Sequence, residues 1–210
     1  MDTVHEGSAV GNAAMPAVPE AAGAEDVLMK ISSDTVKALC LQYWRYDRGA
    51  HIVTLETQGD VGAVLKRFLI ETEVKVSIGD LRRDIRKPIH CYLRYFTGMS
   101  IDLGYWGNLP QLVNKYSKYI SDRQFYFAVP QELENKAVPI IEDMYPYAGL
   151  LVAKINSGIG FNDAVRWGSI ELVKKSAIFP VPRLNTRCMA NMVKAQSATL
   201  TRLSLKVGKP

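Results

Sequence analysis

The fold of this 210-residue chain follows from one stretch of its sequence, Gly59-Asp60-Val61-Gly62-Ala63-Val64-Leu65-Lys66-Arg67-Phe68-Leu69-Ile70-Glu71-Thr72-Glu73-Val74-Lys75-Val76-Ser77. Residues 61–65 and 68–76 are two runs with the composition of β-strands. Only the charged pair Lys66-Arg67 separates them. Two strand-like runs joined by two residues are typical of a β-hairpin, so we expect a hairpin here.

The second run of the predicted hairpin carries charge on one face. Side chains of a strand alternate between faces, so Glu71, Glu73 and Lys75 share one face. The other face carries Ile70, Thr72, Val74 and Val76. Buried carboxylates and ammonium groups are tolerated when they are paired, hydrogen-bonded or bound to metal. If the preceding strand brings Asp60 alongside, one carboxylate from each strand can hold Mg²⁺, with Lys75 beside the water that the metal activates.

The spacing of these residues resembles a known motif. Asp60, Glu73 thirteen positions later and then Lys75 are similar to the PD-(D/E)XK motif of restriction-endonuclease-like nucleases, with Gly59 where that motif has proline. Residues 73–84, 125–130 and 145–152 extend the likeness to MmcB-type DNA-repair endonucleases and related phage proteins. The resemblance covers roughly residues 32–153.

The resemblance implies an α/β fold with a restriction-endonuclease-like three-layer core, in which helices flank a mixed central β-sheet. It implies hydrolysis of DNA phosphodiester bonds in repair, recombination or phage DNA processing. Asp60 and Glu73 would bind Mg²⁺ or Mn²⁺, and the carbonyl oxygen of Val74 would complete the ligand set. Lys75 would orient or deprotonate the attacking water. Glu71 would contact the metal ligands without binding the metal itself.

Three alternatives stay open from the sequence. The pattern Glu-x-Glu-x-Lys also suits an exposed antiparallel strand without chemistry. A nuclease-fold module that binds DNA or a protein without cutting is a different class of function. A junction-resolving or nicking enzyme would use the same residues within a homodimer, and the sequence does not report the oligomeric state.

Composition and charge limit the class of protein. The chain is 48% hydrophobic and 22% charged, as in ordinary globular proteins. It contains no apolar run of membrane-spanning length and no secretory signal pattern at the N-terminus. We therefore expect no membrane partner and a cytoplasmic location, which the resemblance narrows to a bacterial or phage-infected cell. The cysteines Cys40, Cys91 and Cys188 lack zinc-ligand spacing and are expected to be reduced core thiols.

The net charge of +5 is unevenly distributed. Residues 1–29 contain five acidic residues and no lysine or arginine, whereas residues 172–210 contain eight basic residues and no acid. The basic end suits either a phosphate backbone or a solvated surface. We expect residues 1–29 to be a flexible tail, 30–205 a single nuclease-like domain with an insertion near 97–110, and 206–210 a short tail.

Periodicity predicts the remaining elements. Ser32 or Ser33 is expected to cap a helix whose apolar stripe includes Val36, Leu39 and Trp44. A basic helical segment over 77–95 should break at Pro88. Strands are expected over 51–57, 125–129, 148–155 and 166–174, and helices over 112–120, 131–144 and 185–203. Alternation of strands and helices favours a layered α/β domain.

Further site residues are open to two interpretations. Asp34 is either an additional acid that contacts the metal ligands or an acid that the helix dipole favours in the first turn. Arg82, Arg83 and Lys87 are candidate DNA phosphate contacts. The alternative is that Arg83 and Arg86 pair with Asp80 and Asp84 on an exposed face. Trp106, next to Tyr105 in the insertion, either stacks on unpaired DNA bases or pins the loop to the domain.

Overall fold

The computed structural model describes residues 31–55, 59–98, 122–155, 168–179, 184 and 186–207. The chain divides into two units, Met1–Lys30 and Ile31–Pro210, and all described residues belong to the second. Outside the described residues lie the predicted tail at 1–29, the predicted helix over 112–120 and most of the predicted insertion, with Tyr105 and Trp106. Of the tail predicted over 206–210, residues 208–210 also lie outside them, whereas 206 and 207 belong to the last helix, Thr186–Val207.

A mixed six-stranded sheet forms the centre of the domain, in the order β1-β2-β3-β4-β5-β6. Its strands are β1 Ile52–Leu55, β2 Val61–Leu65, β3 Phe68–Val74, β4 Asp122–Pro130, β5 Gly149–Ile155 and β6 Gly168–Lys174. Strand β2 is antiparallel to both of its neighbours, β1 and β3. Strands β3, β4 and β5 run parallel, and β6 is antiparallel to β5. β3 therefore lies inside the sheet, with β2 on one side and β4 on the other.

The predicted hairpin is confirmed as β2 and β3. Leu65 pairs with Phe68, and Lys66 and Arg67 form the turn with φ angles of 51° and 68°. Positive φ at both central residues is the geometry that matches the twist of paired strands. The register places Gly62 opposite Glu71 and Val61 opposite Thr72.

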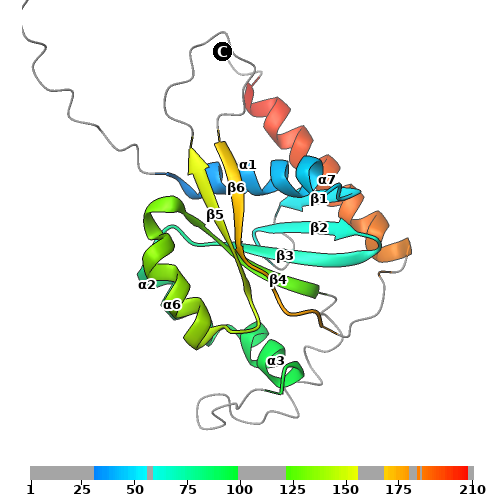
Figure 1. The fold of residues 1–210 in the computed structure, drawn as a ribbon. Coiled ribbons are helices and arrows are strands. Elements are labelled where there is room, and N and C mark those ends of the chain that lie inside the picture. The colour runs from blue at the N-terminus through cyan, green and yellow to red at the C-terminus, as the bar shows by residue number, and fades with distance from the viewer. Residues whose placement is uncertain are drawn as a thin grey trace, which may run out of the picture. The chain divides into compact units, whose positions relative to one another are not determined.

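Helices cover both faces of the sheet (Figure 1). One face packs against α1 Ser33–Gln42 and the π-helical turn Tyr43–Asp47. The other face packs against α2 Ile78–Arg83, α3 Pro88–Phe96 and α6 Glu134–Met144. The structure is therefore α/β, with helices on both faces of a mixed sheet. This confirms the predicted α/β class and the predicted arrangement of layers.

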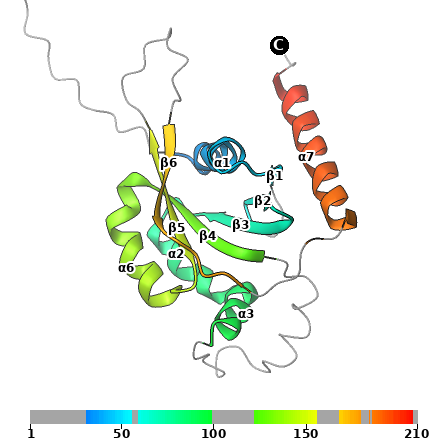
Figure 2. The ribbon, with the colours of Figure 1, turned by 45° about the vertical axis from the view of Figure 1, so that its right-hand side comes forward.

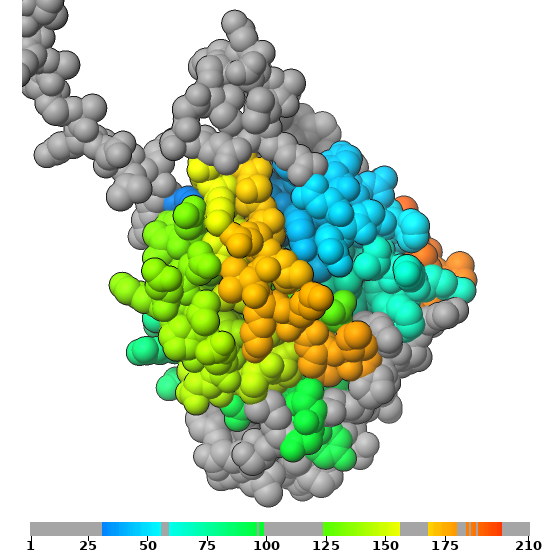
Figure 3. Space-filling view, viewed as in Figure 1, coloured from blue at the N-terminus to red at the C-terminus, as the bar shows by residue number. Residues whose placement is uncertain are grey.

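The last helix, α7 Thr186–Val207, lies beside β1 (Figure 2). Met192 on this helix and Leu184 before it pack against Ile52, Val64 and Leu69 of the hairpin side of the sheet. The backbone N–H of Leu184 also donates to the carbonyl of Arg67 at 2.8 Å. At the opposite edge, β6 lies at the surface between α6 and α1 (Figure 3).

Several local predictions are confirmed. Ser32 caps α1 by accepting a hydrogen bond from the N–H of Thr35, and Val36, Leu39 and Trp44 are buried. The basic segment after β3 divides into α2, a 3-10 turn over Asp84–Arg86, and α3, which begins at Pro88. A proline is favoured at a first helical position because its missing N–H is unpaired there anyway. Cys40 and Cys91 are buried free thiols.

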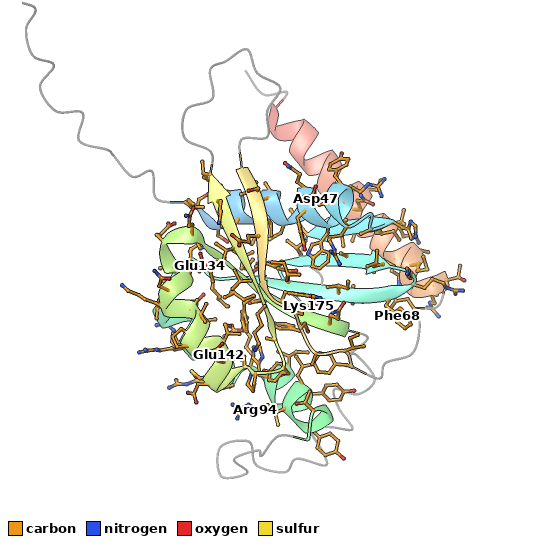
Figure 4. The ribbon with its side chains drawn as sticks, in the orientation of Figure 1. Asp47, Phe68, Arg94, Glu134, Glu142 and Lys175 are labelled. Carbon is orange, nitrogen blue, oxygen red and sulfur yellow. The ribbon has the colours of Figure 1, made fainter. Side chains whose placement is uncertain are left out.

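The predicted strand and helix ends differ from the structure by a few residues. The predicted first strand, 51–57, is β1 over Ile52–Leu55, with 56–58 outside the described residues. The helix predicted over 131–144 begins with a 3-10 turn, Gln131–Leu133, and continues as α6 with Pro139 inside it. Arg94 on α3 donates a 2.8 Å hydrogen bond to the carbonyl of Met144, the last residue of α6. Figure 4 labels Arg94 and two residues of α6, Glu134 and Glu142.

Candidate active site

The two faces of β3 separate apolar from charged side chains as predicted. Ile70 and Val74 belong to the core against α1, and Thr72 on that face accepts a 3.0 Å hydrogen bond from the indole N–H of Trp44. The opposite face carries Glu71, 1% exposed, and Glu73, 9% exposed. An exposed polar strand does not describe this arrangement, because both carboxylates are buried on a central strand.

Lys75 follows directly after β3 and is 4% exposed. Its backbone N–H donates to the carbonyl of Ala128 at 2.9 Å, which continues the pairing of β3 with β4. Its Nζ donates to Glu73 Oε1 at 3.0 Å. The structure thus brings together two of the three motif residues, on the face predicted for both.

Asp60 lies next to these residues but faces another partner. Its Oδ2 accepts a 2.8 Å hydrogen bond from the backbone N–H of Val74, and its Oδ1 is 2.8 Å from Nζ of Lys37 on α1. The Asp60 carboxylate is therefore held at the end of the sheet on the side of α1. Asp34 is exposed in the first turn of α1, where the helix dipole favours an acid.

Gly59 is the residue that faces the two glutamates. Its N–H donates to Glu71 Oε2 at 3.2 Å. A Cβ at this position would lie 3.0 Å from Glu71 Oε2 and 3.5 Å from Glu73 Oε2. The carbonyl oxygen of Thr72 would lie 3.2 Å from the same Cβ, so a side chain here would be crowded and the glycine lets three oxygens approach its backbone.

The donors near Gly59 are oxygens, the ligand type that hard divalent cations prefer. Mg²⁺ takes oxygen ligands and is commonly bound through one or two carboxylates while it keeps several waters. Glu71 and Glu73 supply such oxygens, and Asp60 and the Val74 carbonyl belong to the same end of the hairpin. Across the described residues, no three His, Cys, Asp or Glu side chains come together in a way that could hold a metal ion. A cation at Glu71 and Glu73 would therefore need further oxygen ligands, such as waters.

Asp84 is the main residue of the site that the motif does not include. It is 3% exposed, and its Oδ1 accepts hydrogen bonds from Nζ of Lys75 at 2.6 Å and from Lys87 at 2.8 Å. Burial alone would raise the pKa of Asp84, but hydrogen bonds from His90, Lys75 and Lys87 outweigh it and hold that pKa well below its usual range. The predicted pairing of Asp84 with Arg86 on an exposed face is wrong, because Asp84 points into the domain.

Lys87 joins the same cluster through its contact with Glu73 Oε1. Its side chain is 48% exposed. Partial burial lowers the pKa of Lys87, but the hydrogen bonds to Asp84 and Glu73 raise it further, so the net shift is upward. Lys87 is extended because a proline follows it, and this conformation directs the chain from α2 into α3.

The other predicted phosphate contacts lie on α2. Arg82 and Arg83 are exposed, and Arg83 is 3.6 Å from Asp80, the pair that the alternative interpretation predicted. Arg82 lines a shallow groove between α2 and α6 with residues of both signs of charge. The other lining residues are Asn135, Lys136, Pro139, Ile140, Asp143 and Met144.

A signal for Asp84 was present in the sequence. Leu81, Asp84 and Ile85 follow the spacing i, i+3, i+4, which places the acid on the apolar side of its helix. Likewise, His90 lies among apolar residues in Ile89-His90-Cys91-Tyr92-Leu93. A polar residue within an apolar stripe indicates a buried hydrogen bond partner.

Comparison with known proteins gives no match: no family model fits the sequence, and neither a curated protein nor a solved structure is significantly similar to it. The motif residues and their geometry therefore carry the functional argument. Among the helices of the described residues, none has both the length and the apolar character needed to cross a membrane.

Proposed function

We propose that this protein is a metal-dependent nuclease with a restriction-endonuclease-like fold that hydrolyses DNA phosphodiester bonds with Mg²⁺ or Mn²⁺. The observation that carries the proposal is the buried contact between Lys75 Nζ and Glu73 Oε1 at the end of the central strand. The contact supports the proposal because a carboxylate can hold a divalent cation and an ammonium beside it can orient the water that the cation activates. The choice of DNA, and of a bacterial or phage-infected cell, rests on the motif resemblance.

Each residue has a distinct part in the proposed reaction. Glu71 and Glu73 would hold the cation at Gly59. Asp60 would become a third ligand by releasing Lys37 and binding the cation in its place. A bound divalent cation supplies a water of lowered pKa and offsets charge on the phosphoryl oxygens. Lys75 would hold that water in line with the phosphorus. Lys87, half-exposed and protonated, would contact the phosphate that is cut, and Arg82 and Arg83 the neighbouring phosphates.

The test is cleavage of labelled single-stranded, duplex, nicked and branched DNA by the wild type and Lys75→Ala. Each reaction is run with Mg²⁺, Mn²⁺ or EDTA. Lys175→Ala is the matched control, because Lys175 is an exposed lysine beyond the end of β6 (Figure 4). We expect cutting that needs the metal, survives in Lys175→Ala and is lost in Lys75→Ala. Cutting that persists in EDTA or in Lys75→Ala contradicts the proposal.

One observation favours a second candidate, a nuclease-fold module that binds DNA or a protein without cutting it. Lys37 binds Asp60, and Lys75 and Lys87 both bind Glu73, so lysines already balance the acids of the motif. Under this alternative no substrate is cut, and the wild type and Lys75→Ala bind DNA equally well.

A further inference from the structure

A continuous chain of buried hydrogen bonds ends on Lys75. Tyr147 Oη lies 2.7 Å from His90 Nδ1, and His90 Nε2 lies 2.7 Å from Asp84 Oδ2. The other oxygen of Asp84 is 2.6 Å from Lys75 Nζ. The chain joins the turn before β5, helix α3 and the 3-10 turn after α2 to the end of β3. Tyr147, His90, Asp84 and Lys75 are each at most 4% exposed.

The direction of each hydrogen bond follows from the environment. Burial raises the pKa of Tyr147 well above its ordinary value, so the phenol stays protonated. Its O–H therefore donates a hydrogen bond to His90 Nδ1. Burial also lowers the pKa of His90, which is therefore neutral and donates from Nε2–H to the ionised Asp84. Phe125, Phe127 and Tyr145 pack around the imidazole ring and hold its plane.

We propose that Asp84 is a positioning residue for Lys75, and that His90 and Tyr147 fix the Asp84 carboxylate for this task. The inference rests on the proposed function, since it assigns these residues to the same site. A lysine ammonium sits on a flexible four-carbon stem and has three donors. Glu73 and Asp84 take two of the donors, which leaves a third, and Oδ2 of the half-exposed Asp80 lies 3.6 Å from Nζ. That donor is free for a water or a phosphate oxygen because 3.6 Å is too long for a hydrogen bond.

Structural support alone does not require this chain. Well-packed apolar residues stabilise a core at least as well as buried charges do. His90, held by Tyr147, fixes one oxygen of Asp84, so the other oxygen holds the Lys75 ammonium in a defined orientation. A defined orientation is what an active-site ammonium needs. Removing the hydrogen-bond partners of metal ligands typically lowers metal affinity or activity by about 10- to 100-fold, and we expect an effect at the low end of this range for the partners of Lys75.

Tyr147→Phe is the decisive variant, because it removes one hydroxyl at the end of the chain farthest from Lys75. Tyr145→Phe is its matched control: Tyr145 is buried in the same cluster, and its hydroxyl donates to the carbonyl of Leu81 at 2.6 Å, outside the chain. We expect Tyr147→Phe to lower kcat about tenfold with KM unchanged. Tyr145→Phe should lose similar stability and keep kcat. Equal kcat in the two variants overturns the inference.

A second readout does not depend on cleavage. In ¹H–¹⁵N spectra of lysine ammonium groups without added metal, the signal that disappears in Lys75→Met identifies Lys75. We expect this signal in the wild type and Tyr145→Phe, and its shift or loss in Tyr147→Phe and Asp84→Asn. An unchanged signal in both chain variants overturns the inference. If the wild type cuts no DNA, the proposed function fails, and these spectra alone decide whether Asp84 positions Lys75.

Discussion

Lys75 Nζ lies 2.6 Å from Oδ1 of Asp84, a residue nine positions later on the turn that follows α2. The contact closes a set of two buried carboxylates, Glu73 and Asp84, and two ammonium groups, the buried Lys75 and the half-exposed Lys87. Such a set is balanced in charge, so each member depends on the others. This dependence gives the first prediction.

Replacing Asp84 with alanine should lower the free energy of unfolding by about 3 kcal/mol, because it leaves the buried Lys75 with one of its two close partners. Asp80→Ala is the control. Asp80 is 50% exposed and its contact with Lys75 is long, so its loss should change stability by at most about 0.5 kcal/mol. Urea denaturation of both variants checks the difference. Equal losses would show that the Lys75–Asp84 contact adds nothing to stability.

The buried imidazole of His90 should make stability depend on pH. An unfolded histidine takes up a proton near pH 6.5, but burial lowers the pKa of folded His90. Between these two values the unfolded state binds more protons, so the free energy of unfolding falls as pH falls, by up to about 1.4 kcal/mol per pH unit. His90→Gln should remove this slope between pH 7 and 5, as measured by denaturation. The exposed His51→Gln should keep it, and identical slopes in the two variants would contradict the assignment.

Removing the lysine that occupies Asp60 should strengthen metal binding. Lys37 Nζ lies 2.8 Å from Asp60 Oδ1, and Lys37→Met removes one positive charge from the candidate site. We expect Mn²⁺ to bind about fivefold more tightly, corresponding to about 1 kcal/mol for two unit charges about 4 Å apart that are screened as in bulk water. Titration calorimetry measures the change, with Lys136→Met on the exposed side of α6 as the control. Unchanged affinity would exclude Asp60 as a ligand.

The hairpin turn should become more stable with a better residue at its first position. Lys66 has a φ of 51°, and a left-handed conformation costs most residues about 1–2 kcal/mol. Asparagine tolerates this conformation, so Lys66→Asn should raise the free energy of unfolding by about 0.5 kcal/mol. Lys66→Ala keeps the strain and should leave stability close to that of the wild type. Thermal denaturation compares the three, and a gain with alanine as well would show that the lysine charge, and not φ, is responsible.

The sequence predicted those features that depend on near neighbours. The hairpin at Lys66-Arg67 and the division of β3 into two faces follow from the period of two along a strand. The helix capped by Ser32 and the break before Pro88 follow from capping and from the missing N–H of proline. These signals act over a few residues, so they can be recognised without knowing the rest of the fold.

The partners of the Asp60 carboxylate could not be predicted from neighbouring residues in the sequence. The motif spacing predicted that its carboxylate would lie beside Glu73, yet it binds Lys37 and the N–H of Val74, and Gly59 faces the glutamates instead. Gly59 and Asp60 precede the first residue of β2, so the alternation of strand side chains does not yet govern them. Packing of α1 against the sheet brings Lys37 to that position, and this packing cannot be derived from the hairpin alone.

What the sequence determined by itself is therefore the charged face of β3, with Glu71, Glu73 and Lys75 in fixed alternation. Only the tertiary structure decided which partners those charges have. Tyr147 lies 57 positions from His90, and the parallel pairing of β3, β4 and β5 determines how the elements that carry them meet. Parallel strands are joined by crossover connections, so their neighbours come from distant parts of the chain. A period of two or of 3.6 residues specifies which face a side chain takes, and long-range packing specifies what that face meets.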